Sequence, residues 1–297
     1  MSVPTVAQAL PAFVRWAQAN LATSTVYAYQ RYVTQFVVDV GDMPLDQLTP
    51  SVVKTWSQRW HPLQAMQRFA SWATFEARLI STNPLARLQL PATFGRTRVL
   101  SEPQLASLLR ASSLPFRQLL LALRETIGRP QELRGVRWHE VRQVGGVEAD
   151  LSSLPTGQCY IACRTYKGKK RRRTPAAFRV IVISRRLGRL LVRLAQRGVE
   201  PGDCIFRNTR GRPWSANAVR CAMRRLRLRV GLGADLSGEK VVAYTLRHTQ
   251  ATLLVRRGVR DRLLAEVMGH TSPRMTQRYV HLVPEDLAGA IRKLERR

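Results

Sequence analysis

The spacing of apolar residues near the N-terminus predicts a small helical domain. Apolar side chains recur every three or four residues, the period that gathers them on one face of a helix. The segments with this pattern span residues 6–17, 26–37, 50–56 and 63–79. The third follows Thr49-Pro50, an N-cap residue and a proline suited to the first helical position, and Asn83-Pro84 is expected to end the fourth. We therefore expect a four-helix domain over residues 1–92.

A second domain with a different pattern is expected after a linker at 91–98, which carries Gly95 and two threonines. Ser101-Glu102-Pro103 suits a helix start and leads into an apolar helix. The two runs at 158–164 and 178–183 read as strands joined by a turn rich in Gly, Lys and Arg. Further helices are expected at 215–230 and at 245–257, the latter capped by Gly258. Residues 98–297 should thus form a mainly helical domain with a small antiparallel β-sheet.

The charge of the chain indicates its partner. Forty-nine Lys and Arg against nineteen Asp and Glu give a formal charge of +30, which attracts polyanions and is not expected of an enzyme for small neutral substrates. Residues 1–92 hold only +3 of this charge and the rest of the chain +27. Nucleic acid is the expected partner, contacted mainly by the C-terminal part. A solvated basic surface or a ribosome-associated protein is the alternative.

The cysteines and the apolar runs predict a cytosolic protein. Four cysteines (Cys159, Cys163, Cys204 and Cys221) are too few for a disulfide framework in a chain of 297 residues, and none has the Cys-x-x-Cys spacing of zinc sites. We expect four free thiols and no metal. No signal peptide and no apolar run of about 18 residues is evident, so no membrane span is expected.

Two arginines stand in settings that suit phosphate chemistry. Transfer of a phosphodiester to a hydroxyl passes through a pentacoordinate phosphorus whose non-bridging oxygens gain charge, and forked guanidinium groups stabilise that charge. Arg129 and Arg247 are the candidates, although most single arginines in so basic a chain are surface contacts. Gly128 is expected to let the backbone approach a ligand, and Glu132, one turn on, to hold Arg129.

The rarity of lysine points to a proton donor. The chain has six lysines beside forty-three arginines, and three of the six lie in the turn between the predicted strands (Lys167, Lys169 and Lys170). A departing alkoxide needs a proton, which lysine can release and arginine cannot. Lys167 is the candidate general acid, with Lys169 and Lys170 as fallbacks. The alternative for the turn is a tip that grips the DNA backbone.

Tyr279 is the candidate nucleophile. It follows Gly269-His270 by nine residues, and Ser272-Pro273 is expected to open the helix that carries it. A phenol with a pKa near 10 reacts at neutral pH only where cations favour the phenolate, and Arg129, Arg247 and His270 are the expected cations. A lone tyrosine on an amphipathic helix is more often a core residue, so the assignment depends on the whole set.

Taken in order, these residues resemble the catalytic set of the tyrosine recombinase (phage-type integrase) family. The matching positions are Arg129, Lys167, Tyr244-x-x-Arg247-His248, Gly269-His270 and Tyr279. The resemblance covers nearly the whole chain and implies a two-domain DNA clamp, with a core-binding (SAM-like) domain over 1–92 and an α+β catalytic domain over 98–297. It also implies that Tyr279 attacks the scissile phosphate, leaving a 3'-phosphotyrosyl link and a 5'-hydroxyl, without metal or cofactor.

The chain departs from the family pattern at two positions. Tyr244 stands where the family most often has histidine, and a phenol donates a hydrogen bond but accepts protons poorly at neutral pH. Pro130 directly after Arg129 is also unusual.

The chain starts almost at once with the core-binding helices, so it is similar to Xer-like or transposon-borne recombinases. These act on double-stranded DNA at short inverted-repeat core sites. The family assembles as a tetramer on DNA, and the amphipathic tail at 284–297 is expected to dock on a neighbouring protomer. The event served is integration, excision, inversion or resolution.

Two other functions remain open at this stage. A type IB topoisomerase uses the same tyrosine chemistry but would relax supercoils without joining different duplexes. A decayed integrase relative would bind DNA without cutting it, and would lack one of the clamps or the nucleophile. All of these residues are present here.

Overall fold

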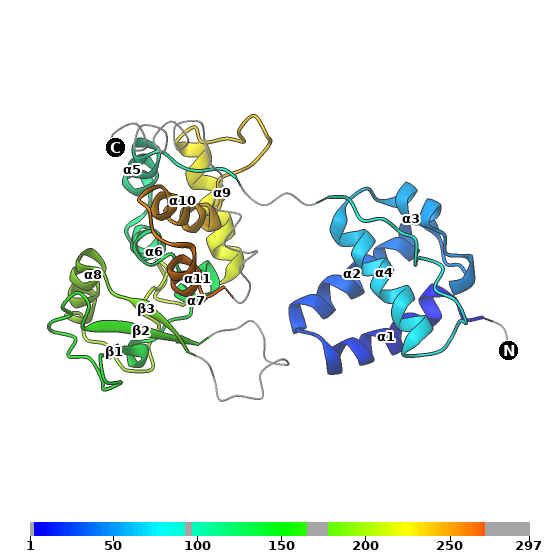
Figure 1. The fold of residues 1–297 in the computed structure, drawn as a ribbon, viewed down its shortest axis with the longest axis horizontal. Helices are drawn as coiled ribbons and strands as arrows, with labels where there is room; N and C mark the ends of the chain where they lie inside the picture. Colours follow the sequence, from blue (N-terminus) through cyan, green and yellow to red (C-terminus); the bar gives the residue numbers. More distant parts are fainter. Residues whose placement is uncertain (1–2, 93–96, 165–177, 271–297) are drawn as a thin grey trace, which may run out of the picture. The chain divides into compact units, whose positions relative to one another are not determined.

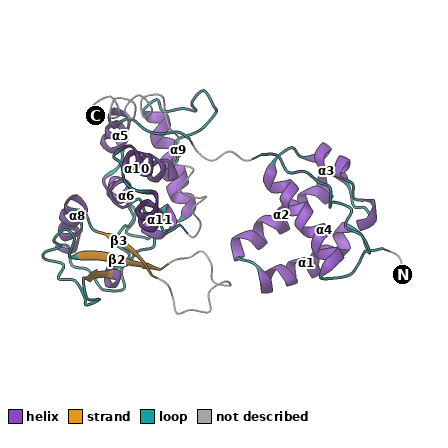
Figure 2. Cartoon of the chain, viewed as in Figure 1, coloured by secondary structure: helices purple, strands orange, loops and turns teal. Residues whose placement is uncertain are grey.

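The protein is divided into two compact units, Met1–Phe94 and Gly95–Arg297 (Figure 1). The computed structural model describes residues 3–92, 97–164 and 178–270. Helices dominate both units, and the strands lie in the second (Figure 2). The mainly helical fold with a small antiparallel sheet, expected from the sequence, is confirmed.

The first unit contains the four helices that the apolar pattern predicts. They are α1 (Val6–Asn20), α2 (Thr23–Val40), α3 (Pro50–Trp56) and α4 (Trp60–Phe75), with a 3-10 turn, η1, at Leu45–Gln47. The expected start of α3 is confirmed, because the Thr49 hydroxyl accepts a hydrogen bond from the amide of Val52 at 3.2 Å. In the core, Phe13 packs edge-on against Phe69, with ring centroids 5.1 Å apart.

The predicted bounds of α4 are wrong at both ends. The helix begins at Trp60 and ends at Phe75, well before Leu79. Arg78 adopts a left-handed φ of 52°, and the amide of Leu79 turns back to donate to the carbonyl of Ala73. This closing turn ends the helix without a glycine or a proline, so the sequence carries no obvious stop signal there.

The second unit contains seven α-helices, one 3-10 turn and three strands over its described residues. They are α5 (Glu102–Ala111), α6 (Leu114–Thr126), α7 (Pro130–Leu133), η2 (a 3-10 turn, Trp138–Glu140), β1 (Val141–Gln143), β2 (Cys159–Arg164), β3 (Phe178–Val182), α8 (Arg185–Ala195), α9 (Ala216–Arg229), α10 (Ala243–Arg256) and α11 (Asp261–Met268). The Ser101 cap of α5 is confirmed. The C-cap of α10 is Arg257, one residue earlier than the expected Gly258, which follows it with a φ of 81°.

The sheet has the order β1-β2-β3 and is antiparallel throughout. The second and third strands are those expected from the sequence. β1, α8 and α11 were missed: β1 is only three residues long, too short for alternation to be visible. Helix α8 does carry a signal, since Ser184 caps it and Leu187, Leu191 and Leu194 share its buried face.

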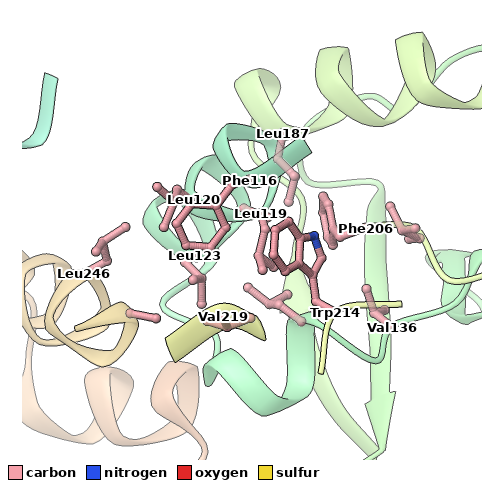
Figure 3. Close-up of a cluster of buried hydrophobic side chains, with 14 of the residues drawn as sticks. Phe116, Leu119, Leu120, Leu123, Val136, Leu187, Phe206, Trp214, Val219 and Leu246 are labelled. Atoms are coloured by element: carbon pink, nitrogen blue, oxygen red, sulfur yellow. The ribbon is translucent and has the colours of Figure 1, made fainter. Parts of the chain in front are cut away.

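Helix α6 lies at the centre of the second unit and leads into the candidate site. Its buried face packs against α10, α8 and α5. Figure 3 shows Phe116 and Leu119 of this helix near Trp214, and the rings of Phe116 and Trp214 lie 5.1 Å apart. Tight packing on several sides fixes the C-terminal end of α6, and with it the turn at 127–129.

Candidate active site

The predicted site residues that the structure describes gather where three elements meet. Arg129 begins α7, Tyr244 and Arg247 lie on α10, and His270 follows α11. Arg129 and Arg247 both donate to backbone carbonyls of the segment 268–270, although Arg129 is 140 residues away from it in the chain. The structure therefore brings Arg129, Tyr244, Arg247 and His270 together.

Arg129 is held from two directions. Its Nη1 donates to Glu132 Oε1 at 2.7 Å, and its backbone amide donates to Glu132 Oε2 at 2.8 Å. Its Nη2 donates to the carbonyl of Gly269 at 2.9 Å. The side chain keeps 14% of its surface exposed. The expectation that Glu132 holds Arg129 is confirmed, because residues three apart meet on one turn of helix.

Gly128 has a packing role, in place of the ligand approach that we expected. A Cβ at this position would stand 2.8 Å from Cγ of Leu133 and 3.0 Å from Oγ1 of Thr126. The room beside Gly128 is thus filled by the chain itself. The glycine lets the turn between α6 and α7 fold tightly and so places the next residue, Arg129.

Ile127, at the end of α6, adopts a left-handed conformation with φ 52° and ψ 22°. A β-branched residue there costs of order 1–3 kcal/mol, and such strain persists only where other contacts impose it. Its carbonyl accepts a hydrogen bond from Nη1 of Arg247 and lies 3.5 Å from Nη2 of Arg179. The strained turn thus presents an acceptor to two buried cations.

Arg247 is completely buried. Besides its bond to Ile127, its Nη2 donates to the carbonyl of Met268 at 2.7 Å and lies 3.4 Å from Nε2 of His270. A guanidinium only donates, so this last contact is a hydrogen bond only when Nε2 of His270 carries no proton. Arg247 therefore links the ends of α6 and α11 and lies against the imidazole.

Tyr244 lies one turn before Arg247 on α10 and keeps 36% of its surface exposed. Its ring centroid is 5.9 Å from Cζ of Arg247, within the range of a cation–π contact. Tyr244, which stands where the family most often has histidine, therefore lies beside Arg247 and is accessible to a ligand.

Arg179 is the site residue that the sequence analysis missed. It lies on β3, is 5% exposed, and its Nη1 donates to Glu132 Oε2 at 2.5 Å. Its Nη2 donates to the carbonyl of Val267 in the last turn of α11. The sequence carries no clear signal, because Val180 and Val182 on the exposed face are as apolar as Ile181 and Ile183 on the buried face that Arg179 shares.

Burial and opposite charge shift two pKa values in this cluster. Burial lowers the pKa of Arg179 to about 10, against the opposing attraction of Glu132. Burial alone would raise the pKa of Glu132, but the nearby guanidinium of Arg179 and the hydrogen bonds from Arg129 outweigh it and lower the pKa. Glu132 is therefore ionised at neutral pH. The four groups Arg129, Arg179, Arg247 and Glu132 then carry a formal charge of +2.

Some predicted residues lie outside the described residues. These are the candidate general acid Lys167 with the turn that holds Lys169 and Lys170, the candidate nucleophile Tyr279, and the tail at 284–297. Their roles remain predictions.

The four cysteines all lie within the described residues and form no disulfide, and three of them are buried. Burial raises the pKa of Cys163 to about 12, so this thiol is neutral. Over residues 3–92, 97–164 and 178–270, no group of three or more His, Cys, Asp or Glu side chains is placed to hold a metal ion. Within the same ranges, no helix combines the length and apolar character needed to cross a bilayer.

Comparison with known proteins decides the family. The model of the phage integrase family matches residues 98–286, which is more than half of the chain. The chain belongs to the phage integrase family. Its members are tyrosine recombinases, so the family expected from Arg129, Arg247, His270 and Tyr279 is confirmed, and the protein is a tyrosine-type site-specific recombinase.

Relatives of this family align over most of the chain. Tyrosine recombinase XerC of Pelotomaculum thermopropionicum is 28% identical over 76% of this chain and 73% of its own length. Tyrosine recombinase XerD of Ralstonia nicotianae is 27% identical over 92% of this chain and 88% of its own length.

Solved structures of phage integrase family members share the fold. The Tn1549 transposon integrase in complex with transposon right end DNA covers 98% of this chain and all of its own, with a TM-score of 0.67 and 19% identity. A lambda integrase tetramer bound to a Holliday junction covers 93% of this chain and 77% of its own, with a TM-score of 0.71 and 17% identity.

Proposed function

We propose that this recombinase breaks and rejoins DNA strands through a covalent 3'-phosphotyrosyl link to Tyr279. The observation that carries the proposal is that Arg129 and Arg247 both donate hydrogen bonds to the segment 268–270. This segment lies nine to eleven residues before Tyr279 in the chain. Two guanidinium groups beside the segment that leads to a tyrosine form a site for a phosphodiester.

Arg129 and Arg247 are the proposed ligands of the non-bridging phosphate oxygens. The cluster around Glu132 has more guanidinium than carboxylate groups, so it favours a transition state with added negative charge. Arg129 is partly exposed and meets the phosphate directly, whereas Arg247 is completely buried. Contact between Arg247 and a phosphate therefore requires movement of the groups that cover it.

The remaining roles follow from the chemistry of each side chain. The Tyr279 phenolate attacks phosphorus, the bond to the 5'-oxygen breaks, and Lys167 gives its proton to that oxygen. Tyr244 and His270 donate hydrogen bonds to the phosphate oxygens. The freed 5'-hydroxyl of a partner strand attacks the phosphotyrosine in turn, so the bond energy is kept and no cofactor is needed.

The proposed substrate is double-stranded DNA with short inverted-repeat core sites, bound by a tetramer. The first unit serves as the core-binding domain and the second as the catalytic domain, which holds +27 of the formal charge of +30. The solved lambda integrase is a tetramer on a Holliday junction, and we propose a similar assembly joined by the tail at 284–297. We also propose that the protein acts in the cytoplasm, where such DNA is accessible to it.

A trapping experiment tests the proposal. The protein is incubated with nicked duplexes of random sequence, which let a cut strand diffuse away, and DNA that stays attached after denaturation is sequenced. We expect the recovered DNA to share one core site, and Tyr279→Phe to yield no adduct while its DNA affinity stays within about twofold, since the hydroxyl adds little to the charge that governs binding. Tyr27→Phe is the matched control, because Tyr27 is a solvent-exposed tyrosine of the first unit.

A supercoiled plasmid that carries the recovered core site, mixed with a second duplex that carries the same site, separates this proposal from its alternatives. Joining of two different duplexes supports recombination, whereas relaxation of supercoils without joining would indicate a topoisomerase. An adduct that persists in Tyr279→Phe, or no adduct with the unaltered protein, would overturn the proposal.

A further inference from the structure

The buried arginine on β3 has no explanation in packing alone. Strand β3 turns Ile181 and Ile183 into the core, and Arg179 shares that face opposite Cys163 of β2. Burying a guanidinium costs several kcal/mol unless charge partners and hydrogen bonds offset it. An aliphatic side chain would fill this position at no such cost, so the contacts that Arg179 makes require a reason.

Those contacts join three elements that carry the proposed active site. Nη1 donates to Glu132, the residue that holds Arg129 on α7. Nη2 donates to the carbonyl of Val267, where the negative end of the α11 dipole favours a cation. The same Nη2 lies 3.5 Å from the carbonyl of the strained Ile127 at the end of α6.

The stem of Arg179 also limits the position of the segment that leads to His270. A Cβ on Gly269 would stand 2.7 Å from Cδ of Arg179 and 3.6 Å from Nη1 of Arg129. Gly269 thus lies directly on the arginine stem, while its carbonyl accepts from Arg129. His270, the next residue, is held against Arg247 by the same placement.

We propose that Arg179 is a positioning residue: it couples Glu132, and through it Arg129, to the end of α11, and so holds Arg129 and His270 at a constant separation. Its guanidinium is ion-paired to Glu132 and its side chain is only 4% exposed, so we assign it a role through other residues and no contact with DNA. Arg179 and Arg129 both pair with the carboxylate of Glu132. The single negative charge of Glu132 is therefore divided between two guanidinium groups and does not fully neutralise Arg129. This inference rests on the proposed function, because it assumes that Arg129 and His270 face the phosphate.

The test compares cleavage with binding on the core site recovered by trapping. Arg179→Met removes the charge at similar volume, and Arg179→Lys keeps the charge but cannot bridge Glu132 and Val267 at once. We expect single-turnover adduct formation to slow about 10- to 100-fold in both variants, with DNA affinity within about twofold. Arg142→Met is the matched control: Arg142 is also a sheet arginine, but it lies 3.9 Å from a solvent-exposed Glu148, and its loss should leave cleavage unchanged.

A double-variant cycle separates positioning from general loss of structure. If Arg179 acts through Glu132, the double variant Glu132→Gln/Arg179→Met should cleave no more slowly than the slower single variant. Should Arg179→Met fail to fold by circular dichroism, Arg179→Lys and its double with Glu132→Gln decide the matter in the same way.

Three results would overturn the inference. They are wild-type cleavage by the folded variants, a loss of DNA affinity that matches the loss of cleavage, or effects that multiply in the double variant. Failure of the proposed function is recognised separately, because the unaltered protein would then give no adduct that depends on Tyr279.

Discussion

The hydroxyl of Tyr244 and its ring make separable contributions at the site. The ring lies 5.9 Å from the guanidinium of Arg247, and the residue is open to a ligand. Phenylalanine keeps the ring and its cation–π contact but removes the only group able to donate to a phosphate. The substitution Tyr244→Phe therefore isolates the hydrogen bond.

We predict that Tyr244→Phe slows adduct formation by the equivalent of about 1 to 3 kcal/mol, the range for a lost hydrogen bond to a charged group. Tyr244→His should recover most of the rate, because an imidazole also donates. The measurement is single-turnover cleavage of the trapped core site, followed by peptide mapping of the DNA-linked tyrosine. Complete loss in Tyr244→Phe, or an adduct on Tyr244, would show that our choice of nucleophile is wrong.

The ionisation of Glu132 makes the stability of the second unit dependent on pH. Its pKa lies below the ordinary value of 4.5, so the unfolded chain takes up this proton at a higher pH than the folded chain does. The stability contributed by the ionised carboxylate is fully present above pH 4.5 and is lost as the pH falls through the folded pKa.

We predict that Glu132→Gln unfolds at a lower temperature than the unaltered protein at pH 7, and that the difference shrinks as the pH falls below about 4.5. Thermal unfolding followed by circular dichroism between pH 7 and pH 3 measures this. Glu102→Gln is the control, since Glu102 is an exposed carboxylate paired with Arg124 on the surface of the same unit. A difference that stays constant with pH would contradict the assignment of Glu132.

At the level of elements, the site depends on how α11 ends. Gly269 caps this helix with a left-handed φ of 62°, and its Cα hydrogen faces the stem of Arg179. Gly258, just after α10, has a similar φ of 81° but has nothing within 4 Å of the place where a Cβ would stand. The two glycines therefore share a left-handed conformation that would strain any other residue. They differ in that only Gly269 lies against the side chain of Arg179.

We predict that Gly258→Ala lowers the free energy of unfolding by about 1 kcal/mol, the cost of a left-handed alanine. Gly269→Ala should lower it by about 2 to 4 kcal/mol, because steric overlap with Arg179 adds to that strain. Gly269→Ala should also slow cleavage, whereas Gly258→Ala should not. Chemical unfolding and adduct formation measure the two effects, and equal costs at the two positions would show that the contact with Arg179 is unimportant.

The structure explains which elements could be predicted and which could not. The capped helices α3 and α5 were predicted at their observed starts, because N-cap and proline signals act within a few residues. The end of α4 was mispredicted, because Arg78 closes it in a left-handed conformation, which an arginine rarely adopts and which the sequence therefore does not predict. The sequence did not show which face of β3 is buried, because both of its faces carry apolar residues.

At the level of the whole molecule, a carboxylate anchors the chain where it enters the second unit. Oε2 of Glu239 accepts from the amides of Thr97 and Arg98, at 2.9 and 2.8 Å, and lies 3.2 Å from the Thr97 hydroxyl. Glu239 lies about 140 residues further along the chain, between α9 and α10. The contact therefore joins the first described residues of the second unit to the loop between α9 and α10.

We predict that Glu239→Ala speeds hydrogen exchange at the amides of Thr97 and Arg98 about tenfold or more, while exchange in the core of the second unit changes little. Hydrogen exchange followed by mass spectrometry measures this. Glu148→Ala is the control, because Glu148 is exposed and lies 3.9 Å from Arg142, too far for a strong ion pair. Unchanged exchange at Thr97 and Arg98 would show that Glu239 does not anchor the entry.

The sequence by itself determined the class of protein and most of the helices, and it supplied the candidate residues of the site. Helical periods, caps and the Arg129–Glu132 pair depend on residues within one or two turns. The net charge depends on composition, and the family resemblance depends on the order of the motifs along the chain. Only the tertiary structure decided that Gly128 packs on Leu133, that Arg247 is buried, and that Arg179 belongs to the site. The contact of Gly128 arises from the way the turn between α6 and α7 closes, and the other two features arise from contacts between segments far apart in the chain. Packing sets the geometry of all three, and the local pattern of residues does not.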